Sequence, residues 1–237
     1  MNKKRINLTS RLEAIAEMVE NCRIVADVGC DHGRLAVSLL QREKAEFMLA
    51  SDISPASVKK TEILAKKCGF LEKMQITHAN GLDAILGKSV DAIIIAGMGG
   101  ILISEILCNG VQIAQKAERI IMQPMRGDKE LRQYLFENGY NIIDERLVFE
   151  DRRAYPIICA RYSGTHDIIP NFFPEDYFEV SYYLAKKRDK NLHRHLLVLK
   201  ERLMLNIQNA GLNSEYEFSL KSINKILQYY NQEGENE

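Results

Sequence analysis

The sequence predicts an α/β fold: a doubly wound parallel sheet built from five strand–helix units, a terminal antiparallel hairpin, and a small C-terminal helical domain. Up to about residue 162, short apolar runs alternate with segments of helical periodicity. After a linker-like stretch around residues 163–174, two leucine-rich stripes follow at heptad spacing. We therefore expect one domain over residues 1–162 and a second over residues 163–237.

Five short segments are predicted to be strands, and the clearest of them, Val90–Ala96, is apolar on both faces, as central parallel strands are. The five segments are Ile24–Val28, Glu46–Asp52, Met74–His78, Val90–Ala96 and Arg119–Met122. Helical spacing and capping residues predict helices around these segments. The first of these helices is capped by Thr9 or Ser10. The others cover Leu35–Leu40, Pro55–Cys68, Leu102–Leu107 and Lys129–Asn138. Two further extended segments, Tyr140–Phe149 and Ala154–Tyr162, are joined by a short charged turn and predict the hairpin.

The C-terminal stripes predict two antiparallel helices that pack through a coiled-coil-like seam. The first stripe contains Leu192, Leu196, Leu199, Leu203 and Ile207, and the second contains Tyr216, Leu220, Ile223, Leu227 and Tyr230. The segment Asn209–Asn213, which contains a glycine, separates them.

Composition excludes several classes of protein. The 237 residues carry 32 Lys and Arg against 32 Asp and Glu, which excludes a globally basic nucleic-acid binder but not a local basic patch. The longest apolar run, Ala92–Ile103, is well short of the about 20 residues that span a membrane. No hydrophobic signal core follows the basic N-terminus, and the five scattered cysteines lack metal-ligand spacing. We expect a cytoplasmic protein with reduced thiols and no metal.

The turn after the first strand carries the strongest chemical signal. A dinucleotide site needs a run of three glycines, but this turn has only Gly29 and Gly33, with Asp27, Asp31 and His32 among them. Carboxylates repel a pyrophosphate and suit a ligand that has a cationic centre and an ammonium group, such as S-adenosylmethionine. The turn therefore favours a methyltransferase over a nicotinamide-dependent dehydrogenase, with a plain tight connection as the structural alternative.

Polar residues after the second and third strands extend this cofactor site. Asp52 closes the second strand, where an acid can accept both hydroxyls of a ribose. Its alternative role is to cap the helix at Pro55. Asn80 and Gly81 follow the third strand and can read the edge of an adenine, although they also make an ordinary turn pair.

The fourth and fifth strands end in residues that suit a planar substrate. Ala96 and Gly97 complete the expected cofactor site, while Gly99 and Gly100 leave room for a base to approach it. A glycine-rich turn into a tightly packed helix is the alternative. Gln123 ends the fifth strand and can bind a base edge or satisfy loop backbone.

Several motifs together resemble one family. They are Arg11-Leu12-x-x-Ile15-Ala16, Asp27-Val28-Gly29-Cys30-Asp31-His32-Gly33, Ala96-Gly97-Met98-Gly99-Gly100, Gln123-Pro124, Leu131-Arg132-x-x-Leu135, Gly139-Tyr140 and Glu145-x-Leu147-Val148 with Tyr155. On these motifs the chain resembles the bacterial tRNA (adenine(22)-N(1))-methyltransferases, the TrmK family. The resemblance implies a class I methyltransferase sheet, S-adenosyl-L-methionine as cofactor, and a tRNA substrate held with help from the C-terminal domain.

The chain departs from that family's pattern at four places. Cys30 stands where Thr or Ser is expected, Asn80 where an acid is common, and Arg34 where an aromatic residue is usual. The segment Met125–Asp128 matches no feature that we can interpret.

The chemistry of adenine N1 suggests candidate catalytic residues. Its in-plane lone pair is itself the nucleophile, so positioning supplies most of the catalysis. The methylated ring is cationic until the N6 amine loses a proton, and Asp31 and His32 are our candidates to assist that loss. Alternatively, Asp31 only binds the methionine ammonium group and His32 only caps the next helix.

Two basic clusters are candidates for phosphate contacts. One is a stripe along the expected C-terminal helix and contains Lys186, Lys187, Arg188, Lys190, Arg194, Lys200 and Arg202, of which Lys187, Arg188, Lys190 and Arg194 are our candidates for tRNA contacts. The other lies at the N-terminus and contains Lys3, Lys4, Arg5 and Arg11. A solvated coiled-coil face is the alternative for the stripe. At the level of function, a methyltransferase with another substrate and a non-catalytic binding protein on the same fold remain alternatives.

Overall fold

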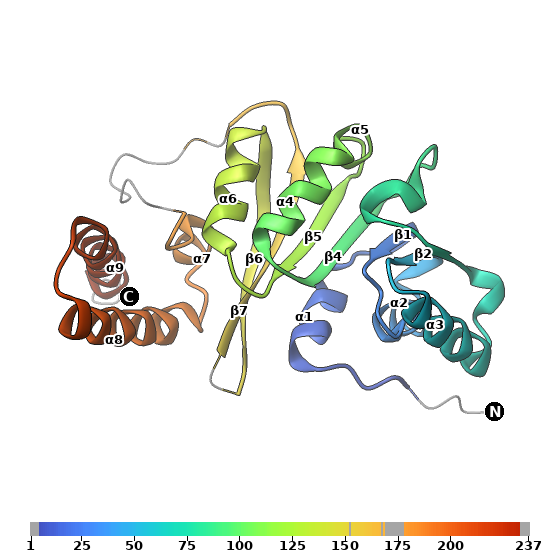
Figure 1. Ribbon diagram of the computed structural model, residues 1–237, viewed down its shortest axis with the longest axis horizontal. Coiled ribbons are helices and arrows are strands. Elements are labelled where there is room, and N and C mark those ends of the chain that lie inside the picture. Colours follow the sequence, from blue (N-terminus) through green and yellow to red (C-terminus); the bar gives the residue numbers. More distant parts are fainter. Residues whose placement is uncertain (1–4, 152, 167, 169–177, 233–237) are drawn as a thin grey trace.

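In the computed structural model of the protein, which describes residues 5–151, 153–166, 168 and 178–232, seven strands form one mixed sheet (Figure 1). The strands are β1 Cys22–Val28, β2 Ala45–Asp52, β3 Met74–His78, β4 Ala92–Met98, β5 Arg119–Pro124, β6 Tyr140–Glu150 and β7 Arg153–Tyr162. Their order in the sheet is β3-β2-β1-β4-β5-β7-β6. The first five strands pair in parallel, whereas β7 pairs antiparallel with β5 and β6. The predicted parallel sheet with a terminal hairpin is confirmed.

Helices cover both faces of this sheet. The described residues form the helices α1 Ser10–Met18, α2 Arg34–Gln41, α3 Pro55–Cys68, α4 Gly100–Asn109, α5 Val111–Ala114, α6 Asp128–Glu137, α7 Tyr182–Lys186, α8 Leu192–Ala210 and α9 Ser214–Gln232, with short 3₁₀ helices at Leu71–Lys73 and Gly81–Ile85. The helices α1, α2 and α3 share one core cluster with Val25 and Ile94. The helices α4 and α6 share the other cluster with Ala26 and Ile93. Central strands buried on both faces explain the unbroken apolar runs.

The strand order reverses at β1. From β1 the chain runs outward through α2, β2 and α3 to β3, and then returns to place β4 on the other side of β1. The helices that follow β1 and β4 therefore lie on opposite faces of the sheet, because α2 and α4 belong to different core clusters. This divergence leaves a crevice at the carboxyl ends of the strands.

Several element ends differ from those predicted, and not every helix is predicted. The strand β4 begins at Ala92 rather than Val90, because the Asp91 carboxylate accepts the backbone N–H groups of Arg23 and Ile24, at 2.7 and 2.8 Å. The sequence pattern does not predict α7, which begins where Ser181 Oγ accepts the backbone N–H of Leu184 at 3.2 Å.

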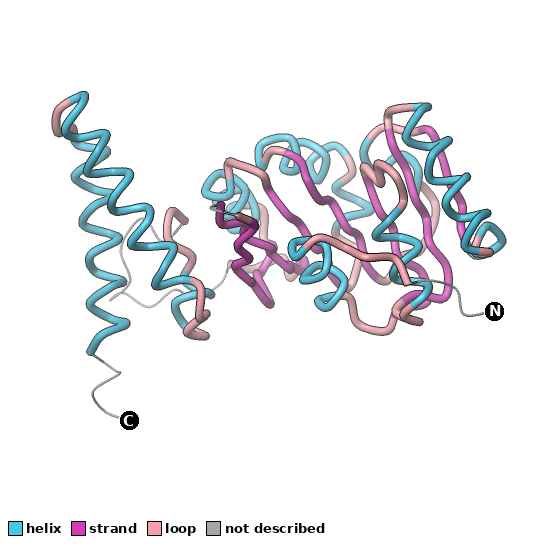
Figure 2. The backbone as a smooth tube through the Cα atoms, turned by 90° about the horizontal axis from the view of Figure 1, so that it is seen from below, coloured by secondary structure: helices cyan, strands magenta, loops and turns pink. Residues whose placement is uncertain are grey.

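We call residues 178–232 the helical arm. Its helices α8 and α9 run side by side and stand apart from the sheet, on the hairpin side of the molecule (Figures 1 and 2). Leu192, Leu196, Leu203 and Ile223 of the predicted stripes are buried together, which confirms the pairing of two helices. The predicted linker at residues 169–174 and the side chain of Tyr230 lie outside the described residues. In the described part of the chain, no helix has the length and apolar character needed to cross a membrane.

The expectation of one basic stripe along a C-terminal helix is wrong. Of the four candidates for tRNA contacts, only Arg194 lies on α8, whereas Lys187, Arg188 and Lys190 lie in the turn between α7 and α8. The short helix ends because Arg188 adopts a left-handed backbone conformation with φ of 52°. The turn is also held to the sheet, since Lys187 Nζ lies 2.6 Å from Asp144 Oδ1.

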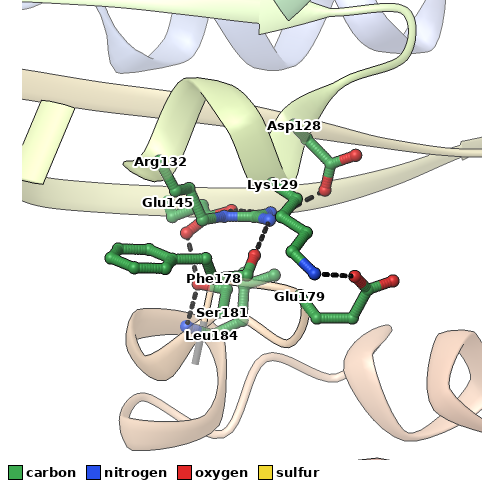
Figure 3. Close-up of polar contacts among 8 residues, drawn as sticks. All are labelled: Asp128, Lys129, Arg132, Glu145, Phe178, Glu179, Ser181 and Leu184. Carbon is green, nitrogen blue, oxygen red and sulfur yellow. Dashed lines mark hydrogen bonds and ion pairs between the residues drawn. The ribbon is translucent and has the colours of Figure 1, made fainter. Parts of the chain in front are cut away.

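A buried ion pair joins the arm to the sheet (Figure 3). Arg132 of α6 and Glu145 of β6 are 4% and 0% exposed, and Arg132 Nε and Nη2 donate to Glu145 Oε1 at 3.1 and 2.7 Å. Arg132 Nη1 donates to Asp128 Oδ2 at 2.8 Å and to the carbonyl oxygen of Phe178, in the arm, at 2.9 Å. Ser181 Oγ donates to the other carboxylate oxygen of Glu145. One arginine therefore fixes α6, β6 and the start of the arm to one another.

Removing this arginine should cost far more stability than removing an exposed lysine nearby. Arg132→Met leaves the Glu145 carboxylate buried without its cation, and such losses cost about 3–5 kcal/mol. Lys129→Met breaks the pair of Lys129 with Glu179, at 3.3 Å and partly exposed, and should cost at most about 1 kcal/mol. Urea unfolding of the two variants measures both losses, and equal losses would mean that the buried pair does not hold the junction.

Candidate active site

A cavity of about 480 Å³ opens at the carboxyl ends of β1 to β5. This volume lies in the usual range for small-molecule sites. The polar end follows β1, β2 and β3 and contains Asp27, Asp31, Asp52 and Asn80. The other end, at β4 and β5, contains mostly apolar side chains and the glycine turn of β4. The strand order thus separates a polar half from an apolar half.

Most of the predicted cofactor residues line this cavity. The lining includes Asp27, Gly29, Asp31, Asp52, Asn80, Gly81, Ala96 and Gly97. Gly33 does not line it. A Cβ at Gly33 would lie 2.5 Å from Thr61 Cγ2, and its φ is 68°, so this glycine allows α2 to begin close against α3. A glycine is therefore required at position 33 for the packing of α2 against α3.

The turn after β1, which contains Gly29 and Cys30, lies close to the ends of both β2 and β4. The N–H groups of Gly29 and Cys30 donate to the carbonyl oxygen of Ser51 at 2.8 and 2.9 Å. A Cβ at Gly29, where φ is 76°, would meet Met98 Cε at 2.1 Å. Burial, followed by the charge of Asp27, raises the pKa of the Cys30 thiol to about 12, so Cys30 is a protonated core residue.

Asp27 is the most unusual group in the cavity. Its side chain is 3% exposed, and its Oδ2 atom has no hydrogen-bond partner among the described residues. Burial, and secondarily the charge of Asp52, raise the pKa of Asp27 to about 7. A buried carboxylate without a partner is costly, and a cationic ligand group would relieve that cost. The ammonium group of S-adenosylmethionine fits this requirement.

Asp52 does not cap a helix. Ser54 caps α3, because its Oγ accepts the N–H of Ser57 at 3.4 Å. The Asp52 carboxylate instead accepts the N–H of Asp31 at 3.0 Å through Oδ2 and that of Ser54 at 2.8 Å through Oδ1. These bonds orient the carboxylate at the edge of the cavity, and each oxygen keeps a lone pair for a ligand hydroxyl.

The two predicted catalytic residues lie side by side at the cavity mouth. Asp31 has a φ of 48°, and its side chain is largely exposed. His32 Nε2 lies 2.8 Å from Lys60 Nζ and 3.5 Å from Asp31 Oδ1. Because an ammonium group only donates, His32 Nε2 is the acceptor in the contact with Lys60. Asp31 therefore has the more available acceptor atoms.

Gln123 satisfies the loop, as its structural alternative predicts. Its side chain is fully buried, and its Oε1 atom accepts the N–H of Gly97 at 3.2 Å and Arg11 Nη1 at 3.0 Å. Arg11 in turn lies over the ring of Tyr155, with 5.1 Å to the centroid, and its backbone N–H donates to Glu150 at 2.7 Å. Arg11 thus ties α1 to the hairpin beside the cavity. Lys3 and Lys4 lie outside the described residues.

The two glycines expected to face the base differ from each other. Around an added Cβ at Gly99 there is nothing within 4 Å, whereas at Gly100 that atom would lie 1.8 Å from the carbonyl oxygen of Gly127. Gly100 therefore permits close packing against the next loop, and neither glycine is among the residues lining the cavity.

Sequence reasoning missed the apolar lining. It includes Leu12, Val28, Leu35, Ile53, Met98, Leu102, Ile106 and Met125, and Arg34 also lines the cavity. Ile53 directly follows the end of β2, and Met125 directly follows the end of β5. Because the sequence analysis places Asp52 and Gln123 of these two strand ends in the site, the positions of Ile53 and Met125 could have predicted that they line it too.

A parallel sheet with a reversal at β1, and acids at the ends of β1 and β2, define a class I methyltransferase. In agreement, residues 8–158 match the family model for a methyltransferase domain. The chain is 32% identical over 162 residues to the tRNA (adenine(22)-N(1))-methyltransferase of Bacillus subtilis (strain 168), covering 68% of each chain. The chain belongs to this family of bacterial tRNA methyltransferases.

Two solved structures extend the similarity over the helical arm. Streptococcus pneumoniae Sp1610 in complex with S-adenosyl-L-methionine has a TM-score of 0.83 and 26% identity, covering 93% of this chain and 100% of that one. M. capricolum TrmK in complex with S-adenosyl-homocysteine has a TM-score of 0.78 and 25% identity, covering 94% and 97%.

The raised pKa of Asp27 predicts how stability depends on pH. Between the unfolded value of 3.8 and the folded value of about 7, only the folded state keeps the proton, so the contribution of Asp27 to stability falls as pH rises. The full loss is at most about 4 kcal/mol. Asp27→Asn removes this dependence, so its stability advantage over the unsubstituted protein should widen from about pH 5 to 7 and then stay constant. Unfolding free energies across this range give the test, and a constant difference would show an ordinary Asp27.

Proposed function

We propose that this protein transfers the methyl group of S-adenosyl-L-methionine to N1 of adenine 22 in tRNA. Its family membership supports this activity. The observation that carries it in the structure is the buried Asp27 carboxyl group, whose Oδ2 atom has no partner among the described residues, beside the apolar half of the same cavity. A cationic cofactor satisfies the carboxylate, and the open half receives a planar base. A tRNA substrate also agrees with a cytoplasmic enzyme.

The cofactor roles follow from the strand ends. Asp27 and Asp31 bind the ammonium group, and Asp52 binds the ribose hydroxyls through the lone pairs that its backbone contacts leave available. Asn80 and Gly81 border the adenine of the cofactor. Gly29, Ala96 and Gly97 have small side chains or none, so the cofactor can lie close to their backbone. Gly33 contributes indirectly, by letting α2 begin against α3.

When bound, S-adenosyl-L-methionine supplies an electrophilic methyl group on a sulfonium centre. The nucleophile is adenine N1 and needs no activating base, so the main task of the protein is to hold the ring in line with that methyl group. Asp31 is the candidate acceptor for the N6 proton, because its side chain is exposed at the cavity mouth. His32 is the second candidate, with Nε2 engaged by Lys60.

We assign the tRNA phosphates to the root of the arm. A groove of about 720 Å³ runs between α1, β6 and the turn before α8, and Lys187, Arg188 and Lys190 line it beside Arg146. Arg194 lies over the ring of Phe149, with 4.3 Å to the centroid. In this proposal residues 1–162 form the catalytic domain and residues 163–237 the tRNA-binding domain.

The direct test is incubation of the protein with labelled S-adenosyl-L-methionine and bulk tRNA, followed by nucleoside analysis. Label in 1-methyladenosine at position 22 is the expected result. Label in another nucleoside, or transfer only to protein or small molecules, would identify a methyltransferase with a different substrate. Cofactor binding without transfer to any of these would identify a non-catalytic protein on the same fold.

Asp52→Ala should weaken the binding of S-adenosylhomocysteine by about 1.5–3 kcal/mol, the range for hydrogen bonds to a charged group. Calorimetric titration measures the change, and circular dichroism checks the fold. Asp83→Ala, which removes an exposed acid outside the cavity lining, is the matched control and should leave the affinity unchanged. Equal affinity in both variants would remove Asp52 from the cofactor site.

Neutralising Lys187, Arg188, Lys190 and Arg194 together should weaken tRNA binding and spare S-adenosylhomocysteine. Each lost phosphate contact should lower the slope of log affinity against log salt by roughly 0.7–0.9. Lys187 already pairs with Asp144, so it should contribute least of the four. A matched variant that neutralises Lys59, Lys66, Lys67 and Lys73, around α3, controls for total charge. If the two variants behave alike, the root of the arm is not a specific phosphate site.

A further inference from the structure

We propose that Met98, Leu102 and Met125 form an apolar platform that receives the unpaired target adenine, an inference that rests on the proposed tRNA methylation. All three side chains line the β4 and β5 end of the cavity. The proposal gives a role to the loop that begins at Met125, which the family resemblance leaves without one.

The exposure of these side chains is the first argument. Leu102 is 48% exposed and Met125 is 42% exposed, although both lie at a cavity whose neighbouring strand residues Ile95 and Met122 are fully buried. Apolar side chains that stay open to solvent beside a cavity favour a ligand that covers them. The ligand that reaches this end must lie next to the cofactor half.

Backbone hydrogen bonds fix the loop at Met125 beside β4 and α4. The Met125 N–H donates to the carbonyl oxygen of Met98 at 2.7 Å, and the Gly100 N–H donates to that of Arg126 at 2.8 Å. Since any side chain at Gly100 would strike Gly127, the loop can approach α4 only because residue 100 is glycine. These contacts bring Met125 against the strand end that carries Met98 and the helix that carries Leu102.

Open space adjoins the platform. At Gly97, which lines the cavity beside Met98, an added Cβ would find nothing within 4 Å, so the end of β4 leaves room for a flat group. Met98 also reaches the other half of the cavity, because its Cε atom lies where a Cβ of Gly29 would stand. A ring on this platform therefore borders the turn that we assign to the cofactor.

The chemistry of the platform fits a purine. A thioether is polarisable and makes favourable contacts with aromatic rings, and unbranched methionines adapt to the shape of a ligand. The nearby cation, Arg11, contacts Gln123 Oε1 and the ring of Tyr155, and its Nη1 atom also lies 2.6 Å from Met125 Sδ. The last contact holds the Met125 side chain beside the cavity. Stacking on such a surface offsets part of the energy that is needed to unstack a base from its helix.

The test uses Met125→Ala, Leu102→Ala and the double variant in the full-length protein. Each single change should lower kcat/KM for tRNA roughly two- to tenfold, the range for losing one contact of this kind with an aromatic ring. The affinity for S-adenosylhomocysteine should stay unchanged, because neither residue lies at the polar half. Met98 is left in place, since it also contacts the glycine turn.

Two further variants separate the platform from a general loss of structure. Met125→Leu keeps an apolar side chain of similar volume and should restore most of the activity. Ile63→Ala truncates an exposed residue of α3 outside the cavity lining and should match the unsubstituted protein. A tRNA with 2-aminopurine at position 22 should give a weaker fluorescence rise on binding to the double variant, because the flipped base is held less often.

The outcomes distinguish this inference from the function on which it rests. If the unsubstituted protein methylates adenine 22 and the double variant keeps its full kcat/KM, the platform is wrong while the function stands. If Met125→Ala weakens S-adenosylhomocysteine as much as tRNA, Met125 belongs to the cofactor site and the inference also fails. If the unsubstituted protein methylates no tRNA, the function and the platform fail together.

Discussion

The reversal of strand order at β1 is the constraint on which the rest of the molecule depends. Because α2 and α4 leave the adjacent strands β1 and β4 on opposite faces, the chain diverges there and a cavity opens at the carboxyl ends of the strands. The residues that follow β1 and β2 therefore face one half of the cavity, and those that follow β4 and β5 face the other. Chain topology thus creates the two halves of the cavity, and the side chains at the strand ends make one half polar and the other apolar.

Two buried acids show how differently the fold treats charge. Glu145 is fully buried and fully partnered, by Arg132 on one oxygen and Ser181 on the other. Asp27 is just as deep, yet one of its oxygens has no partner among the described residues. A satisfied buried pair fixes the relative position of the elements that meet there, whereas an unsatisfied carboxylate stores an energetic cost that ligand binding can release. The first acid is therefore structural and the second belongs to the site.

Residues placed by strand order were predictable from the sequence, and those placed by remote packing were not. Asp27 and Asp52 could be assigned because each closes an apolar strand, and parallel strands end at one edge. Gly33 could not, since the partner that requires a glycine there, Thr61, is on another helix. The turn at Lys187 could not be predicted from the heptad pattern either. Ser181 caps the short helix α7, and Asp144 of β6 binds Lys187 in the turn, and neither contact leaves a periodic pattern in the sequence.

The helix α6 connects the arm to the apolar half of the cavity. Asp128, its first residue, accepts a hydrogen bond from Arg132 one turn later, and Arg132 also holds the carbonyl oxygen of Phe178 in the arm. The loop that leads into this helix packs its backbone against Gly100 and presents Met125 to the cavity. A helix is stiff over this length, so the position of the arm and that of the Met125 loop are set by one element. Binding energy gained where the arm meets a distant part of a large substrate can thus serve to place the reacting base.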